Sequence, residues 1–135
     1  MDMREINRKV IEQFRAGGEV DGMHRERLLL LTTTGARTGA QRTTPMMFHR
    51  HDDRLLVMAS NNGAPAAPDW FHNLVANPDV TVEIGAERYS AVAKPLAGDE
   101  LAGSWADITA ANPFFLDHEK QAGRTIPVVA LDRTA

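Results

Sequence analysis

Cysteine is absent from this 135-residue chain, and that absence excludes several kinds of site at once. A disulfide framework, a thiolate zinc site, an iron–sulfur cluster and a cysteine nucleophile all require this residue. The chain is long enough to bury a core without such staples. We therefore expect a fold held by its hydrophobic core, in a reducing compartment such as the cytoplasm.

Long hydrophobic runs and an excess of positive charge are missing as well. The longest aliphatic run is Leu28 to Leu31, and the N-terminal residues are charged throughout, so neither a membrane span nor a signal peptide is predicted. The formal net charge is −3, whereas binding to nucleic-acid phosphates requires a clustered surplus of Lys and Arg. A nucleic-acid partner is therefore not expected, and any anion site has to be local.

The composition that remains is typical of one globular domain spanning residues 1–135. Hydrophobic residues make up 43% and charged residues 24% of the chain. Within residues 1–18, Met3, Ile6, Val10 and Phe14 recur at helical spacing, and Gly17 follows, which predicts an amphipathic helix. This helix either packs on the domain edge or gives residues 1–16 a weak peripheral association with the inner face of a membrane.

The composition of residues 27–131 is typical of short strands separated by turns, and these residues form the predicted barrel. Turns at GARTGA, Asp52-Asp53 and Gly85-Ala86 predict hairpins and hence antiparallel pairing. Closing such a sheet removes exposed edges, so we expect a mainly β (α+β) barrel with flanking helices. The predicted strands are near 27–34, 42–51, 54–60, 80–84, 87–94 and 126–131, and the further helices near 69–76 and 99–111.

The stretch LLTTTGARTGAQRTT contains the first candidate site. Its glycines allow backbone N–H groups to converge, and Arg37 and Arg42 add charged donors suited to phosphate or carboxylate. The spacing is neither that of a Walker loop nor G-x-G-x-x-G. The alternative interpretation is an ordinary hairpin turn with solvated arginines.

A second candidate site lies where a strand ends at Ala59-Ser60 and Trp70-Phe71 begin a helix. Small residues at a strand end admit a flat ring, although core packing is the alternative role for Trp70. His49 and His51 alternate on one strand without an evident third ligand, so they are interpreted as a solvated hairpin end and no metal site is predicted.

Several of these motifs occur together in one known family. TTTGARTG, Arg42-x-x-Pro45, Ala59-Ser60, Pro68-x-Trp70, Asn77-Pro78 and the closing Arg124 to Val129, in this order, resemble the deazaflavin-dependent nitroreductase family over roughly residues 28–130. The resemblance implies a split β-barrel, here with six antiparallel strands, that binds coenzyme F-420, an 8-hydroxy-5-deazaflavin. It also implies hydride transfer to quinones, activated alkenes or nitro compounds.

The resemblance also implies site residues. The phosphate and glutamyl tail would lie near Arg37 and Arg42, and the deazaflavin ring along Pro45 and residues 58–61, covered by residues 70–73. The implied cofactor-binding residues are Thr34, Gly35, Arg37, Thr38, Gly39, Gln41, Arg42, Pro45, Met58, Ala59, Ser60, Asn61, Trp70, Phe71 and Asn73. Ser60 and His118 are the candidate catalytic residues, with an exposed turn as the alternative for His118.

The chain also departs from better-known nitroreducing relatives. Ala36 and Asn61 stand where basic residues are frequent, and Met47, Asn112, Phe115 and His118 stand where tyrosines are found. The sequence therefore predicts an F-420-dependent oxidoreductase, monomeric or homodimeric, that acts on a small-molecule quinone, enone, lactone or nitro compound. An FMN-binding split-barrel reductase and a noncatalytic deazaflavin carrier remain the alternatives.

Overall fold

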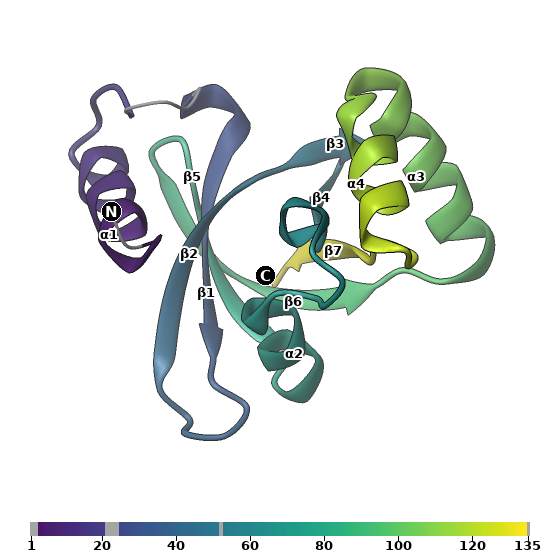
Figure 1. Ribbon diagram of the computed structural model, residues 1–135. Helices are drawn as coiled ribbons and strands as arrows, with labels where there is room; N and C mark the ends of the chain where they lie inside the picture. Colours follow the sequence, from purple (N-terminus) through teal and green to yellow (C-terminus); the bar gives the residue numbers. More distant parts are fainter. Residues whose placement is uncertain (1–2, 21–24, 52, 135) are drawn as a thin grey trace.

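The structure, a computed structural model, describes residues 3–20, 25–51 and 53–134. Figure 1 shows a curled antiparallel sheet with helices on its outer surfaces. The α-helices are α1 (Met3–Arg15), α2 (Asp69–Ala76), α3 (Gly98–Ala111) and α4 (Phe114–Ala122), and short 3-10 helices are η1 (Arg25–Arg27) and η2 (Asn61–Gly63). The strands are β1 (Leu28–Thr34), β2 (Gln41–Met47), β3 (His49–His51), β4 (Arg54–Met58), β5 (Asp79–Ile84), β6 (Glu87–Pro95) and β7 (Val128–Arg133).

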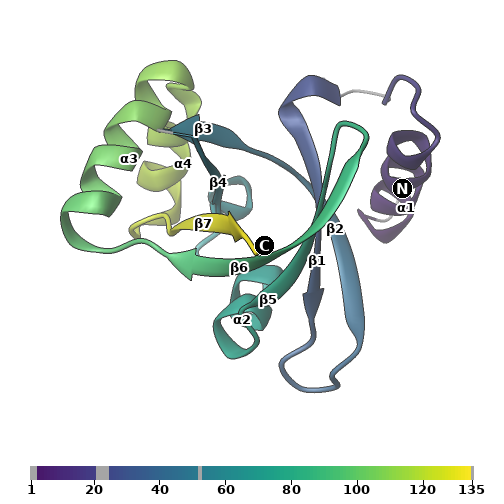
Figure 2. The same ribbon diagram turned by 180° about the vertical axis from the view of Figure 1, so that it is seen from behind.

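One extended segment closes the barrel. The strand order is β2-β1-β5-β6-β7-β4-β3, so β2 and β3 lie at opposite ends of the sheet although only Phe48 separates them in sequence. The segment pairs with β1 before Phe48 and with β4 after it. The antiparallel barrel is confirmed (Figures 1 and 2), but the single strand predicted at 42–51 is two strands, because the segment changes partner at Phe48.

Both faces of β1 are buried, which explains its run of four leucines. Leu29 and Leu31 pack in the barrel interior, whereas Leu28 and Leu30 pack against Val10 and Phe14 of α1. The predicted amphipathic helix is therefore present, and its apolar face is covered by the sheet. In the described part of the chain, no helix is long and apolar enough to span a membrane.

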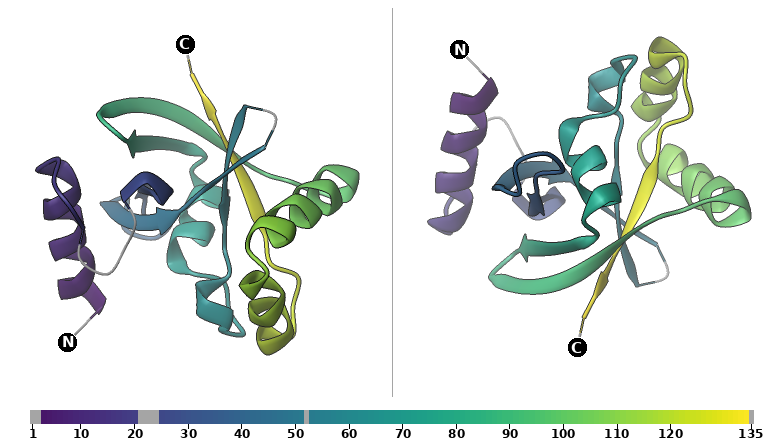
Figure 3. Two further views of the ribbon diagram at one scale, coloured as in Figure 1. Left: turned by 90° about the horizontal axis from the view of Figure 1, so that it is seen from above. Right: turned by 90° about the horizontal axis from the view of Figure 1, so that it is seen from below.

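Helix α2 covers one end of the barrel, and helices α3 and α4 lie on the side away from α1 (Figure 3). Leu74 of α2 is fully buried in the barrel interior, next to the half-buried Trp70 and Phe71. Helices α3 and α4 pack against the outer face of β4 and β7 through a second cluster that includes Ile108 and Phe115.

Helix α4 was not predicted as a helix. Its sequence FFLDHEKQA places Phe115 and Ala122 seven residues apart on one buried face, and Gly123 ends it in the left-handed conformation at φ 65°. The polar residues between them suggested a turn, but they occupy the outer face of this short amphipathic helix.

Candidate functional site

The glycine turn between β1 and β2 is tightly folded. The Gly35 N–H donates to the Ala40 carbonyl at 2.8 Å, and the Gly39 N–H donates to the Gly35 carbonyl at 3.0 Å. A Cβ added at Gly35 would lie 3.0 Å from Thr38 Oγ1 and 3.2 Å from the Ala40 oxygen, and Gly39 has a φ of +71°. Both glycines are therefore required by the shape of the turn.

Helix α2 is joined to this turn by two hydrogen bonds. Asn73 Oδ1 accepts from the Ala36 N–H at 3.1 Å, and Asn77 Nδ2 donates to the Thr34 carbonyl at 3.4 Å. Two regions predicted to bind one cofactor, about 35 residues apart in the sequence, are thus brought together. The Asn73 amide is occupied in positioning the turn.

Two adjoining hollows lie at this junction, and we call them together the arginine groove. The first, about 450 Å³, is lined by residues 35–38 with Arg42, Asp69, His72 and Asn73. The second, about 310 Å³, shares Arg42, Asp69 and Asn73 and adds Asn7, Arg8, Ile11, Thr33, Thr43, Thr44 and Trp70. The groove therefore runs from the glycine turn to the space between α1 and the start of α2.

The arginines of the groove differ from Arg15 and Arg54, which are ion-paired. Arg15 forms a two-bond ion pair with Glu83, and Arg54 pairs with Asp132 and Glu100. Within the described ranges, Arg37 and Arg42 are exposed and have neither an ion pair nor a side-chain hydrogen bond. Asp69 is the carboxylate beside them, so the groove keeps a surplus of positive charge on an acidic protein and fits a ligand carrying several anionic groups.

Not every predicted residue of the turn faces the groove. Thr34 and Gln41, which are cross-strand partners, line a separate hollow together with Thr32, Thr81 and Ser90. Successive side chains of a strand point to opposite faces, so Thr33 faces the groove and Thr34 does not. Contact of Thr34 and Gln41 with the cofactor therefore stays a prediction that the position of the groove does not support.

The predicted ring-binding strand end is more buried than expected. Ala59 is 0% and Met58 8% exposed, and Met58 packs under α3 and α4. Pairing with β7 continues to Met58, and the Ala59 N–H donates to the Pro127 carbonyl at 2.9 Å. The expectation that the Ala59 side chain lies against an open ring slot is therefore corrected, because Ala59 belongs to the core.

The loop after this strand is held by Arg124, a residue whose role was missed. Its guanidinium donates to the carbonyls of Ala59, Ser60, Ala64 and Ala66 at 3.2 to 3.3 Å. Backbone carbonyls are available in every loop, so no sequence signal marks such partners. This contact fixes the position of Ser60, which is 7% exposed, and of the exposed Asn61.

His118 lies on α4, which packs against η2, the turn directly after Ser60. Its ring is edge-on to Phe114 and Phe115, with centroids 5.4 and 5.7 Å away. His118 Nδ1 is buried and has no hydrogen-bond partner in the described structure. The exposed-turn interpretation is therefore wrong, since the imidazole is half-buried in a helix.

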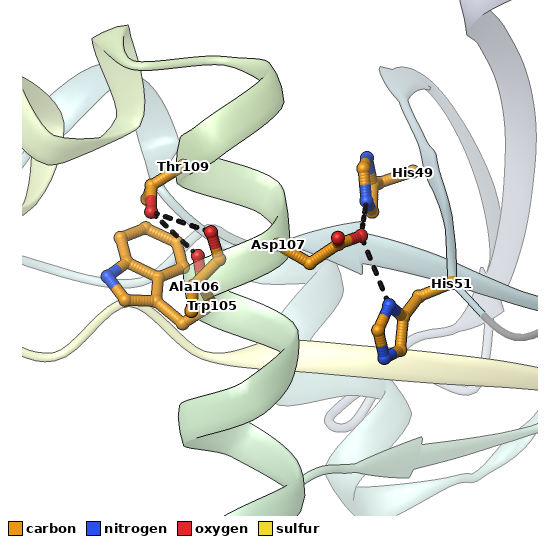
Figure 4. A network of polar contacts seen from close by, with 6 residues as sticks. All are labelled: His49, His51, Trp105, Ala106, Asp107 and Thr109. Atoms are coloured by element: carbon orange, nitrogen blue, oxygen red, sulfur yellow. Dashed lines mark hydrogen bonds and ion pairs between the residues drawn. The ribbon is translucent and has the colours of Figure 1, made fainter.

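His49 and His51 also have a different environment from the predicted one (Figure 4). His49 Nε2 and His51 Nδ1 both donate to Asp107 Oδ2, at 2.6 and 3.1 Å, and tie β3 to α3. The hydrogen bond from His49, followed by that from His51, lowers the pKa of Asp107. Among the residues the structure describes, no group of three or more potential ligands is arranged for a metal ion.

A larger cavity, about 740 Å³, lies next to this cluster and away from the arginine groove. Its lining includes Arg27, Phe48, His49, Ile84 and Asn112, and none of the predicted cofactor-binding residues. Cavity size and the predicted site therefore point to different ends of the barrel. The arginine groove is the better candidate for an anionic cofactor because Arg8, Arg37 and Arg42 line it beside the tight glycine turn, with Asp69 as the carboxylate among its lining residues.

Comparison with known proteins gives the family of this chain. The family model described as F420H2-dependent quinone reductase, named after reduced F-420, matches residues 3–133. An F420H2-dependent quinone reductase of Mycobacterium tuberculosis (strain ATCC 25618 / H37Rv) is 40% identical over 108 residues, which cover 78% of this chain and 72% of the relative. The solved structure of an F420-H2 dependent reductase (FDR-A) has 32% identity and a TM-score of 0.72, covering 82% of this chain and all of that one.

A second solved structure, described as a domain-swapped dimer, has 30% identity and a TM-score of 0.74, with 96% of both chains covered. These matches confirm the predicted resemblance, the split-barrel fold and coenzyme F-420 as the cofactor, and they do not favour FMN. The chain belongs to the F420H2-dependent quinone reductase family.

Proposed function

We propose that this protein reduces a quinone with reduced F-420 and holds the anionic tail of that cofactor in the arginine groove. The observation that carries the proposal is the set of exposed arginines without acidic partners beside a tight glycine turn. When bound, reduced F-420 supplies a hydride. The contribution of the chain is then to bind, orient and shield the reactants, and hydride transfer from the cofactor requires no protein nucleophile.

Arg37 and Arg42 are the proposed ligands of the tail. Both are long, exposed guanidiniums that present several N–H donors to phosphate or carboxylate oxygens. Gly35 and Gly39 have no side chain, so the backbone N–H groups of the turn are not screened from the ligand at these positions. Trp70, which lines the second hollow, is the proposed apolar contact between the tail site and the ring site.

Ser60 and Asn61 are proposed to contact the deazaflavin ring, together with Pro45 on the unpaired edge of β2. The loop that carries Ser60 and Asn61 is kept rigid by Arg124, so its polar groups are already oriented before a ligand binds. Met58 and Ala59 support this loop from the core instead of touching the ring.

His118 is proposed to deliver a proton to the oxygen of the reduced acceptor. Hydride addition to a quinone leaves negative charge on oxygen, and imidazole is the side chain that most readily donates a proton near neutral pH. The unpartnered Nδ1 and the flanking rings of Phe114 and Phe115 support this role, since they give the imidazole a defined orientation and exclude water.

The test is a side-by-side titration of the purified protein with F-420 and FMN, followed by turnover of reduced F-420 with a small naphthoquinone. We expect saturable binding of F-420, much weaker binding of FMN, and quinone-dependent oxidation of the reduced cofactor. Tight binding without turnover would indicate a carrier, and preferential binding of FMN would contradict the proposal.

The expected partners are a small-molecule acceptor and, in a homodimer, a second copy of the chain. The similarity to a domain-swapped dimer makes the homodimer the first state to test, and sedimentation velocity separates it from a monomer. The burial of the apolar face of α1 gives no support to the weak peripheral membrane association considered above.

A further inference from the structure

We propose that α1 forms the second wall of the cofactor site, with Arg8 and Asn7 binding the anionic tail, so that cofactor binding fastens α1 to the barrel. This inference rests on the proposed function. It adds to the site Asn7 and Arg8, which lie outside the family motifs, and Thr33, which lies within TTTGARTG but is not among the predicted cofactor-binding residues.

Helix α1 places a cation, Arg8, on the side of the groove opposite α2. Val10 and Phe14 bury one face of the helix against β1, while Asn7, Arg8 and Ile11 line the second hollow. The start of α2, with Trp70 and Asn73, forms the other side of this hollow. In the part of the chain that the structure describes, Arg8 has no ion pair or hydrogen bond, so its guanidinium is available to a ligand.

Thr33 provides an independent indication of a ligand at the same hollow. The residue is 1% exposed, lines the hollow, and its Oγ1 has no hydrogen-bond partner within the described ranges. A buried hydroxyl without a partner is costly, and an anionic or carbonyl oxygen of a ligand would satisfy it. Thr33 is the direct cross-strand partner of Arg42, so a hydroxyl and a guanidinium face one point from adjacent strands.

The charge balance of the hollow favours an anion. Arg8 and Arg42 face Asp69, the carboxylate on this hollow, which leaves one net positive charge in the second hollow before Arg37 of the first is counted. A tail with a phosphate and several carboxylates presents several anionic groups to the cations of the two hollows. The geometry assigns its path from the glycine turn, past Arg42, to Arg8.

Binding along this path would also add an attachment to α1. The helix packs on the barrel through an apolar cluster that extends to Ile6 in its N-terminal half, and Arg15 at its C-terminal end pairs with Glu83. A ligand bridging Arg8 and Arg42 would add an attachment in the N-terminal half, and local opening of the helix would become less frequent.

The experiment measures binding of F-420, and of a deazaflavin that lacks the phosphate and glutamyl tail, to the Arg8→Ala and Lys9→Ala variants by fluorescence titration. Lys9 is the matched control because it is the next cation on the same helix and does not line the groove. We expect Arg8→Ala to weaken F-420 binding by about tenfold, with the difference shrinking as salt is added, and to leave binding of the tail-less compound unchanged.

Hydrogen exchange of the α1 amides gives a readout independent of activity. Saturating F-420 should slow exchange in α1 of the wild type and of Lys9→Ala but not of Arg8→Ala. Equal F-420 affinity in both variants, with no protection of α1, would overturn this inference and leave the proposed function standing. A wild type that does not bind F-420 at all would overturn both.

Discussion

At the scale of single residues, some surface arginines are ion-paired, whereas Arg37 and Arg42 beside the glycine turn are not. Arg15 and Arg54 join secondary-structure elements through carboxylates. Arg37 and Arg42 make no such bond within the described structure and border a groove. A guanidinium without a partner contributes little to folding, so its removal should affect ligand binding and leave stability nearly unchanged.

The first prediction concerns these two side chains. Arg37→Ala and Arg42→Ala should each raise the dissociation constant of F-420 about tenfold to a hundredfold, because a charge-assisted hydrogen bond contributes about 1.5 to 3 kcal/mol. Fluorescence titration at two salt concentrations measures this effect. Arg88→Ala, an exposed cation on β6 outside the groove, is the control, and wild-type affinity in both groove variants would place the tail elsewhere.

The second prediction concerns His118. His118→Phe keeps an aromatic ring between the neighbouring phenylalanines but cannot donate a proton, so turnover of a naphthoquinone should fall at least about tenfold while F-420 affinity stays near the wild-type value. The pH–rate profile should also lose one ionisation. Lys120→Ala on the exposed face of α4 controls for changes in the helix. Identical turnover and profile would mean that water provides the proton.

At the scale of elements, the site depends on contacts that hold loops and helices together. Arg124 gathers four carbonyls of the loop after β4, and the β3–α3 contact depends on one carboxylate oxygen of Asp107. These contacts hold the loop after β4 and strand β3 in position, so their loss should make these segments locally more mobile.

The third prediction is that Arg124→Gln loosens residues 59–66. Several half-buried carbonyls would lose their donor, which costs about 1 to 3 kcal/mol for such a group, and their neighbouring amides should exchange faster. F-420 binding should weaken in parallel because Ser60 and Asn61 are no longer held. Native-state hydrogen exchange checks this expectation, with Arg88→Gln as control. Unchanged exchange in the loop would show that the clamp is not required.

The fourth prediction concerns pH. The pKa of Asp107 is lowered in the folded protein by hydrogen bonds from His49 and His51. A depressed carboxyl pKa contributes stability above the pKa of the unfolded chain, and this stability is lost as the pH falls through the folded value. The wild type should therefore be more stable than Asp107→Asn at neutral pH, and the difference should disappear in acid.

Thermal unfolding across a pH series measures that difference. Asp117→Asn, an exposed carboxyl on α4, is the control and should show a much smaller pH dependence of its difference from the wild type. A constant difference between wild type and Asp107→Asn at every pH would mean that packing, and not the ionised carboxylate, maintains the β3–α3 contact.

At the scale of the whole molecule, β4 lies between two hydrophobic clusters. Val57 packs in the barrel interior and Met58 under α3 and α4, so the strand end at Ala59 has no free space on either side. The barrel core and the proposed cofactor site therefore meet between the buried Ala59 and the loop that begins at Ser60.

The fifth prediction tests that boundary. Ala59→Leu inserts additional carbons into a filled core and should destabilise the protein by about 1 to 3 kcal/mol, with loss of F-420 binding as a secondary effect. Denaturant unfolding measures the change. Ala86→Leu in the exposed turn between β5 and β6 is the control. Normal stability combined with lost binding would instead return Ala59 to the ring site.

Much of the site follows from local patterns that act over a few residues. The glycines of the turn are needed for its backbone conformation, the run of leucines for a strand buried on both faces, and the family resemblance for the cofactor. Helix α4 was missed because its apolar residues are few. The division of residues 42–51 into two strands was missed because a change of strand partner does not alter the alternation of apolar and polar residues. In the sequence, Phe48 is indistinguishable from its neighbouring strand residues, and only the folded sheet shows that the chain changes partner there.

The sequence by itself determined the class of fold, the position of the cationic turn and the family, because backbone preferences and charge are local properties. Tertiary structure alone decided that Thr33 and not Thr34 faces the groove, that Ala59 is core, and that Arg8 stands opposite Arg42. It also decided that His49 and His51 meet Asp107, 56 or more residues away. The physical reason is that which face of an element is covered depends on chain segments that are remote in sequence and adjacent only after the barrel has closed.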